Sequence, residues 1–129
     1  MTKRNIVHIE IPAANVAKAA EFYNKLFGWQ VTVDEKFNYS MWEPGLPPGG
    51  GFSPLGEDVK VGDVLIYVDS DDIEADLKQA EALGATSVRL KTEIPGIGWF
   101  GIFKDPTGNM IALYTSLNPE FNKYSRLKV

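Results

Sequence analysis

The order of predicted elements occurs twice along this chain, and this internal duplication limits the fold more than any other feature of the sequence. In the first half, an alternating strand at 6–11 precedes a helix that Asn15 caps and Gly28 ends. In the second half, a β-branched run at 64–68 precedes a helix capped at Asp72. Superposing the two caps aligns the halves at a period of about 57 residues. The sequence therefore predicts two copies of one module, because a solenoid would need at least three.

Each predicted helix is followed by three predicted strands. The strand predictions are 29–33, 37–42 and 51–53 in the first half, and 86–90, 99–103 and 110–115 in the second. Gly84 is predicted to end the second helix. We interpret the Gly- and Pro-rich segment 44–51 as a loop, because its glycines lack the Lys-Ser/Thr pair and the following helix of a phosphate-binding loop.

These elements form two tandem βαβββ modules, about 5–54 and 62–116, and predict an α+β fold. The polar connector between the modules is too short for a flexible linker, so a single domain over 1–129 is expected. Residues 117–129 lie outside both modules and are expected to pack as a short helix on the body or on a second subunit. We expect the protein to be a homodimer.

Composition excludes several classes of function. The absence of cysteine removes disulfides, thiolate metal sites and a Cys nucleophile. A net charge of -4 with scattered lysines gives no surplus of cations for phosphate backbones, so no nucleic-acid partner is expected. No apolar run approaches the roughly 18 residues that cross a membrane, and no secretory signal is recognised. No membrane partner and a cytoplasmic location are therefore predicted.

His8 is the only histidine of the chain and lies on the polar face of the first predicted strand. Glu10 shares that face with a Cα separation of about 6.5 Å, which suits joint metal ligation or an acid/base pair. The alternative is that His8 is a hydrogen-bonded lining residue, since the sequence supplies no recognisable Ser or Cys partner for it. The residues alone leave both interpretations open.

Three separated stretches stand out as motifs: VHIEIP at 7–12, AEFYNKLFGW at 20–29 and FKDPTGN at 103–109. They resemble the vicinal oxygen chelate superfamily, which includes glyoxalase I, bleomycin resistance proteins and extradiol dioxygenases. Together with PGIGWF at 95–100, they are similar to a bacterial branch described only as related to lactoylglutathione lyase. The resemblance covers roughly 5–116, and several motifs in the right order make it specific.

The resemblance implies that each module curls into half of a barrel-like cup, so that the α+β fold has a curled mixed sheet with its helices outside. It also implies a divalent metal on the concave side, held in each module by a His on the first strand and a Glu or His on the last. His8 matches the first of these positions, whereas Leu65 stands at its counterpart in the second half. The last-strand ligands correspond to residues near 51–53 and to Ala112, none of which can ligate a metal.

Because catalytic metals are held by three or more protein ligands, one surviving histidine does not support family-type metal catalysis. We therefore predict no cofactor and no metal. The alternative is one divalent metal ion at a non-standard site formed by His8, Glu10 and Glu43.

The implied cup would place aromatic side chains around a ligand pocket with a few polar tips. The candidate pocket residues are His8, Glu10, Tyr39, Trp42, Phe52, Tyr67, Trp99, Phe100 and Tyr114. Each aromatic residue taken singly could instead be sheet core.

The leading hypothesis is a small-molecule binding protein of the glyoxalase/bleomycin-resistance type, independent of metal, with an aromatic pocket for an unknown organic ligand. The acidic balance would suit a cationic ligand. The alternative is a metal-dependent lyase, isomerase or dioxygenase that uses the site around His8. A third hypothesis is a non-catalytic structural or regulatory module whose residues 117–129 contact a partner.

Overall fold

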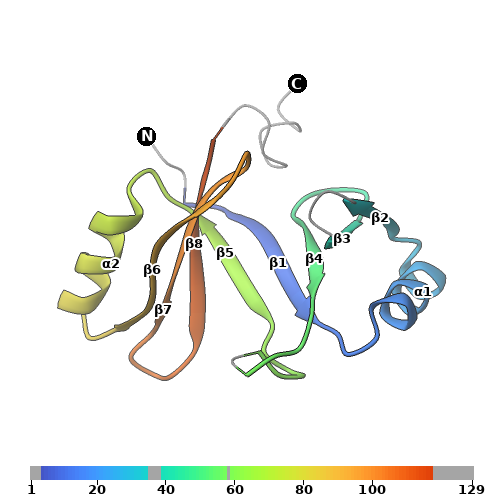
Figure 1. The fold of residues 1–129 in the computed structure, drawn as a ribbon, viewed down its shortest axis with the longest axis horizontal. Coiled ribbons are helices and arrows are strands. Elements are labelled where there is room, and N and C mark those ends of the chain that lie inside the picture. The colour runs from blue at the N-terminus through green and yellow to red at the C-terminus, as the bar shows by residue number, and fades with distance from the viewer. Residues whose placement is uncertain (1–3, 35–38, 58, 118–129) are drawn as a thin grey trace. The chain divides into compact units, whose positions relative to one another are not determined.

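The computed structural model describes residues 4–34, 39–57 and 59–117, and within them each helix follows one strand and precedes three (Figure 1). The chain divides into two compact units. The first unit is His8–Leu65, and the second combines the described residues up to Val7 with those from Ile66 onward. The α+β class and the repeated βαβββ order are thus confirmed, whereas a single domain over 1–129 stays a prediction.

The first unit contains a four-stranded mixed sheet covered by one helix. Its elements are β1 (Ile6–Pro12), α1 (Val16–Phe27), β2 (Gln30–Asp34), β3 (Tyr39–Glu43) and β4 (Gly49–Ser53). The strands follow the order β2-β3-β4-β1, in which β1 is parallel to β4 and the other neighbours are antiparallel. Of the predicted strand 37–42, residues 37 and 38 lie outside the described part of the chain.

Helix α1 begins and ends at the residues that the sequence indicates. The Oδ1 atom of Asn15 accepts a hydrogen bond from the Lys18 backbone N–H at 3.0 Å, which satisfies one of the free donors of the first turn. At the other end Gly28 has φ 77° and donates its N–H to the Asn24 carbonyl at 2.8 Å. Glycine suits this left-handed position because it has no Cβ.

Stacked aromatic rings dominate the core between α1 and its sheet. Trp42 and Phe52 are buried, and Trp42 stacks on Trp29 with a centroid separation of 4.3 Å. Tyr23 of α1 stacks on Trp29 at 5.2 Å and on Phe52 at 5.9 Å. These four rings and the buried Ala13 join α1 to β3 and β4, so this sheet face is occupied by core packing.

The glycines at 49–51 form the start of β4, so the loop predicted over 44–51 ends before residue 49, and the strand predicted at 51–53 begins two residues earlier. A Cβ at Gly50 would lie 1.9 Å from the Ile9 carbonyl oxygen and 2.4 Å from the Trp42 ring. The strand is therefore glycine-rich because its neighbours pack directly against its backbone. The pattern of glycines predicts a turn when it is considered alone, and tertiary packing overrides that preference.

The second unit repeats the architecture of the first. Its elements are β5 (Leu65–Asp69), α2 (Ile73–Ala82), β6 (Thr86–Ile94), β7 (Gly98–Lys104) and β8 (Met110–Ser116). The strands follow the order β5-β8-β7-β6, with β5 parallel to β8 and the other pairs antiparallel. Ile73 and Leu77 of α2 are buried against Leu113 of β8, with Val68, Trp99 and Phe103 around them.

The predicted boundaries of β5, β7 and β8 hold to within one residue, whereas the ends of α2 and β6 differ from the prediction. Asp72 caps α2 by accepting from the Ala75 N–H at 3.0 Å, but the helix ends at Ala82, and Leu83 rather than Gly84 is its C-cap. Strand β6 continues four residues past its predicted end at 90, because register shifts between Ser87 and Thr92 let the irregular edge keep pairing with β7. No helix within the described residues is long and apolar enough to span a membrane.

The turn 105–109 between β7 and β8 forms around a single carboxylate. Asp105 Oδ1 accepts from the backbone N–H groups of Asn109 at 3.0 Å and Thr107 at 2.9 Å, and from the Thr107 hydroxyl at 2.8 Å. These bonds, led by the one from Asn109, hold the pKa of Asp105 below its usual value. The charge therefore serves to shape the turn.

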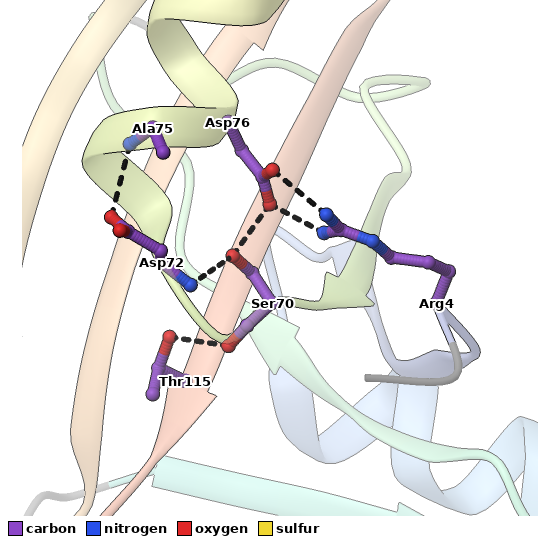
Figure 2. A network of polar contacts seen from close by, with 6 residues as sticks. All are labelled: Arg4, Ser70, Asp72, Ala75, Asp76 and Thr115. Carbon is purple, nitrogen blue, oxygen red and sulfur yellow. Dashed lines mark hydrogen bonds and ion pairs between the residues drawn. The ribbon is translucent and has the colours of Figure 1, made fainter. Parts of the chain in front are cut away.

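The N-terminal segment 4–7 packs on the second unit through a polar network (Figure 2). Arg4 forms a bidentate ion pair with Asp76 of α2, and the Asp69 N–H donates to the Asn5 carbonyl at 2.9 Å. The buried Ser70 hydroxyl donates to Asp76 at 2.6 Å, while Thr115 donates to the Ser70 carbonyl at 2.7 Å. The hydrogen bond from Arg4, and that from Ser70, lower the pKa of Asp76.

Candidate functional site

The candidate site lies on the sheet face of the first unit that α1 does not cover. Alternation along β1 turns Ile9 and Ile11 toward the core under α1, which leaves His8 and Glu10 on the opposite face. Tyr39 at the start of β3 reaches them from the other side of β4. The structure thus brings together three of the residues that the sequence marks as candidates.

One ring nitrogen connects the three side chains of this cluster. His8 Nε2 lies 2.8 Å from Glu10 Oε2 and 2.8 Å from the Tyr39 hydroxyl oxygen. The side chains of His8 and Glu10 are 22% and 13% exposed, so the cluster is largely shielded but reachable from solvent. An imidazole, a carboxylate and a phenol at hydrogen-bonding distance can accept, donate or transfer a proton. We call these three residues the His8 cluster.

Gly51 makes the His8 cluster possible, and this role was missed in the sequence. The register places Gly51 of β4 between Glu10 of β1 and Met41 of β3. A Cβ at Gly51 would lie 1.7 Å from the Tyr39 hydroxyl oxygen and 2.8 Å from Glu10 Oε2. Tyr39 can therefore cross β4 only because position 51 carries no side chain. The alternation of β3 could have revealed this role in the sequence, because Tyr39 and Trp42 lie an odd number of residues apart and so point to opposite faces. Their rings lie over Gly51 and Gly50 respectively.

The residues of this face do not fit the family's metal centre. Glu43 lies exposed at the end of β3, paired with Gln30, and the structure does not bring it to His8 and Glu10. Over the described ranges, no three His, Asp or Glu side chains come close enough together to hold a metal ion. In place of a carboxylate at position 51, the cluster has the neutral hydroxyl of Tyr39.

The second unit carries no comparable cluster in its described residues. Glu10 of β1 pairs with Gly51 of β4, and Tyr67 of β5 pairs with Ala112 of β8. Glu10 and Tyr67 are therefore equivalent, as the alignment of the two helix caps predicts. By the same registers, Leu65 replaces His8 and Phe100 replaces Tyr39. The polar chemistry therefore belongs to one copy of the duplicated module.

The remaining aromatic candidates fall into two groups. Trp42 and Phe52 are core residues under α1, and Trp99 packs against the cluster under α2, so we do not include these three in the site. Tyr67, Phe100 and Tyr114 lie on the opposite face of the second unit's sheet, as their alternation with the α2-facing residues shows.

Two of these uncovered aromatic residues already have neighbours within the second unit. The Arg89 guanidinium lies over the Phe100 ring, 5.6 Å from its centroid. The Tyr114 hydroxyl donates to the Ile97 carbonyl at 3.4 Å, and burial raises the pKa of this phenol. Tyr114 is therefore a proton donor across the neutral range rather than a base.

Two βαβββ units are the architecture that the resemblance to the vicinal oxygen chelate superfamily implies. The sequence model of the glyoxalase-like domain family matches residues 7–114, and this chain belongs to that family. A glyoxylase-like domain-containing protein of Didymella fabae is 29% identical over 83% of this chain and 90% of its own length. Anthracycline biosynthesis protein DnrV of Streptomyces peucetius is 24% identical over 81% of this chain, which spans only 44% of that protein.

Solved structures share this fold at low sequence identity. A hypothetical protein of Bacillus halodurans superposes with a TM-score of 0.71 and 12% identity, over 93% of this chain and 99% of that one. Methylmalonyl-CoA epimerase of Streptomyces coelicolor, in complex with 2-nitronate-propionyl-CoA, gives 0.64 and 20% over 92% and 100%. A glyoxalase/bleomycin resistance protein/dioxygenase superfamily member of Vibrio splendidus gives 0.64 and 13% over 88% and 100%.

Proposed function

We propose that this protein binds a small organic molecule at the His8 cluster without a metal ion, as a binding protein of the glyoxalase/bleomycin-resistance type. The observation that carries the proposal is the single nitrogen, His8 Nε2, held 2.8 Å from both a carboxylate and a phenol on the sheet face that α1 does not cover. Such a group can recognise polar atoms of a ligand directly, so it does not need a metal to do so.

The donor set supports metal independence on chemical grounds. A carboxylate and an imidazole are only two of the three or more ligands that a catalytic metal requires. Tyr39, the third member, is a neutral phenol at ordinary pH and a poor ligand for a divalent ion in that form. The missing ligand positions, Gly51 and Ala112, cannot donate an electron pair from a side chain.

An aromatic ligand is favoured by the ring of the His8 cluster. Tyr39 presents this ring on the face of the first unit's sheet that α1 does not cover. We propose that it supplies stacking surface. The S. peucetius relative is named an anthracycline biosynthesis protein, and anthracyclines are aromatic compounds. That name supports an aromatic ligand for this chain.

The test is a thermal-shift screen of the purified full chain with small aromatic probes: benzoate, acetophenone, benzylamine and 1-naphthol. A probe at 100 times its Kd should stabilise the fold by about 2.7 kcal/mol, which raises the midpoint by several degrees. We expect His8→Ala and Glu10→Gln to abolish the shift. Thr32→Ala is the matched control, because Thr32 lies on the same face but on the edge strand β2.

Elemental analysis of the same samples decides between the proposal and a metal-dependent lyase, isomerase or dioxygenase. Stoichiometric divalent metal that is present in the wild type and lost in His8→Ala would overturn metal independence. A midpoint shift that persists undiminished in both His8→Ala and Glu10→Gln would place the ligand elsewhere.

A further inference from the structure

Two oxygen atoms of the His8 cluster lie at hydrogen-bonding distance from the same ring nitrogen, which can form a well-aligned bond with only one of them. An imidazole nitrogen either carries one proton and donates, or carries a lone pair and accepts, so it makes one well-aligned bond. His8 Nε2 nevertheless has two oxygens at the same distance of 2.8 Å. One of the two partners must therefore satisfy its remaining hydrogen-bonding capacity elsewhere.

The chemistry of Glu10 and Tyr39 decides which of the two oxygens keeps a hydrogen-bonding group that His8 does not satisfy. An ionised Glu10 can only accept, so its contact with His8 requires the proton to sit on Nε2. The Tyr39 oxygen then meets an N–H and cannot donate its own proton to that nitrogen. Among the described residues, the Tyr39 hydroxyl has no hydrogen-bond partner other than His8. Its O–H is consequently available as a donor.

We infer that Tyr39 donates the hydrogen bond by which this site recognises a carbonyl oxygen of an aromatic ligand, and that Gly51 is the positioning residue for it. The inference rests on the proposed function and names its ligand class. A neutral carbonyl fits better than a carboxylate, because Glu10 would repel a second negative charge at this distance.

The duplicated module supports the role given to Gly51. At the equivalent positions of the second unit, Phe100 replaces Tyr39 and Ala112 replaces Gly51. The copy without a hydroxyl thus has a side chain where the other copy needs an open position. In the first unit that open position is filled by the Tyr39 hydroxyl, only 1.7 Å from where a Cβ would stand.

Nitrogen-15 NMR of the imidazole tests the geometry without any ligand. His8 is the sole histidine, so its ring signals need no assignment among others. We expect the Nε2 signal to report the protonated form in the wild type, and to change in both Tyr39→Phe and Gly51→Ala but not in Thr32→Ala. An Nε2 signal of the unprotonated, accepting form in the wild type would overturn the donor assignment, because Tyr39 would then donate to His8.

Binding of matched probes tests the recognition itself. Acetophenone carries the carbonyl, ethylbenzene has nearly the same shape without it, and benzoate adds the charge. We expect acetophenone to bind the wild type about tenfold more tightly than either of the others, and Tyr39→Phe to remove that preference. Gly51→Ala should give the same loss, and the double variant should be no worse than Tyr39→Phe alone.

The possible failures are distinguishable. If no probe binds the wild type, the proposed function fails and the inference with it. If acetophenone binds Tyr39→Phe as tightly as the wild type, the site binds ligands but Tyr39 is not the donor. If Gly51→Ala binds acetophenone as tightly as the wild type and leaves the imidazole spectrum unchanged, while Tyr39→Phe does neither, Tyr39 remains the donor and the positioning role of Gly51 is refuted.

Discussion

The two units share one backbone plan but carry their polar chemistry in different places. The first unit has His8, Glu10 and Tyr39 on its uncovered sheet face, where the second has Leu65, Tyr67 and Phe100. The uncovered face needs no particular side chain for the sheet to form, so chemistry there can change without loss of the fold. The polar cluster is therefore on the first copy, whereas two of the three equivalent positions in the second are apolar.

Before and within the first turn of each unit's helix, the second unit carries the polar residues and the first unit carries alanines. Ser70 and Asp76 of the second unit stand where the first unit has Ala13 and Ala19, as the shared caps show. Ala13 and Ser70 are both buried. Each donates its N–H to a carbonyl on the last strand of its unit, Ser53 of β4 and Tyr114 of β8 respectively, at 2.9 Å. Only the second unit receives Arg4 at this point, so the polar groups serve to hold the N-terminal segment (Figure 2).

The largest expected effect comes from the equivalent core positions Phe52 and Leu113. Phe52→Ala should lower the free energy of unfolding by about 3–5 kcal/mol and Leu113→Ala by about 2–5 kcal/mol, because each leaves a cavity in a close-packed core. Urea denaturation measures the loss of unfolding free energy in each variant, and hydrogen exchange shows in which unit the stability is lost. If the units are separate cooperative bodies, each variant will lose protection in its own unit; loss in both from either variant would show one folding unit.

The neighbouring glycines of β4 give the next contrast. Gly50→Ala should cost about 3 kcal/mol, since its Cβ would meet the Ile9 backbone at 1.9 Å and the buried Trp42 ring. Gly51→Ala should cost less than about 1 kcal/mol, because the Tyr39 hydroxyl that it meets is the end of a movable side chain. Thermal unfolding of both variants measures this. Equal losses would mean that the two faces of β4 are equally rigid.

Exchanging Ala13 and Ser70 tests why the polar network belongs to one unit. Ala13→Ser should destabilise by about 1–3 kcal/mol, because its buried hydroxyl would have no carboxylate at the position of Ala19. Ser70→Ala should cost about 1 kcal/mol through the lost bond to Asp76. Chemical denaturation gives both values. A neutral Ala13→Ser would show that the first unit can satisfy a hydroxyl there without a charged partner.

The smallest effect concerns the pH dependence of the Arg4–Asp76 ion pair. The pKa of Asp76 is lower in the folded chain than its usual 3.8, so the pair stabilises above that value and the contribution disappears as pH falls through the folded pKa. Arg4 is 54% exposed, so solvent limits the effect to on the order of 0.5 kcal/mol. Urea denaturation at pH 7 and pH 3 should show that Arg4→Gln lowers stability at pH 7 but hardly at pH 3.

The control for this prediction is Lys25→Gln, which removes an exposed i,i+4 ion pair with Glu21 on α1. It should change stability by a few tenths of a kcal/mol at pH 7. Asp69 and Asp71 also act on Arg4, so Arg4→Gln removes their attraction as well. A loss from Arg4→Gln that is as large at pH 3 as at pH 7 would contradict the ion-pair account.

The sequence by itself determined the duplication, the α+β class and the helix caps at Asn15 and Asp72. These features depend on local periodicity and capping chemistry, which can be recognised from residues that are close together in the sequence. It also identified His8 and Glu10 as a pair, because alternation along a single strand puts them on one face. The resemblance placed the counterpart of Ala112 near residues 51–53, and the strand register identifies it as Gly51.

Only the tertiary structure showed that Tyr39 completes the His8 cluster and that Trp42 and Phe52 are core. Which face a β3 residue takes depends on its pairing with β4, and that pairing places residues far apart in sequence on neighbouring strands. The glycines 49–51 predict a turn locally, yet they form a strand because two rings, one on each face, need the space that a Cβ would fill. Local pattern therefore determined the module, and cross-strand packing decided where its chemistry lies.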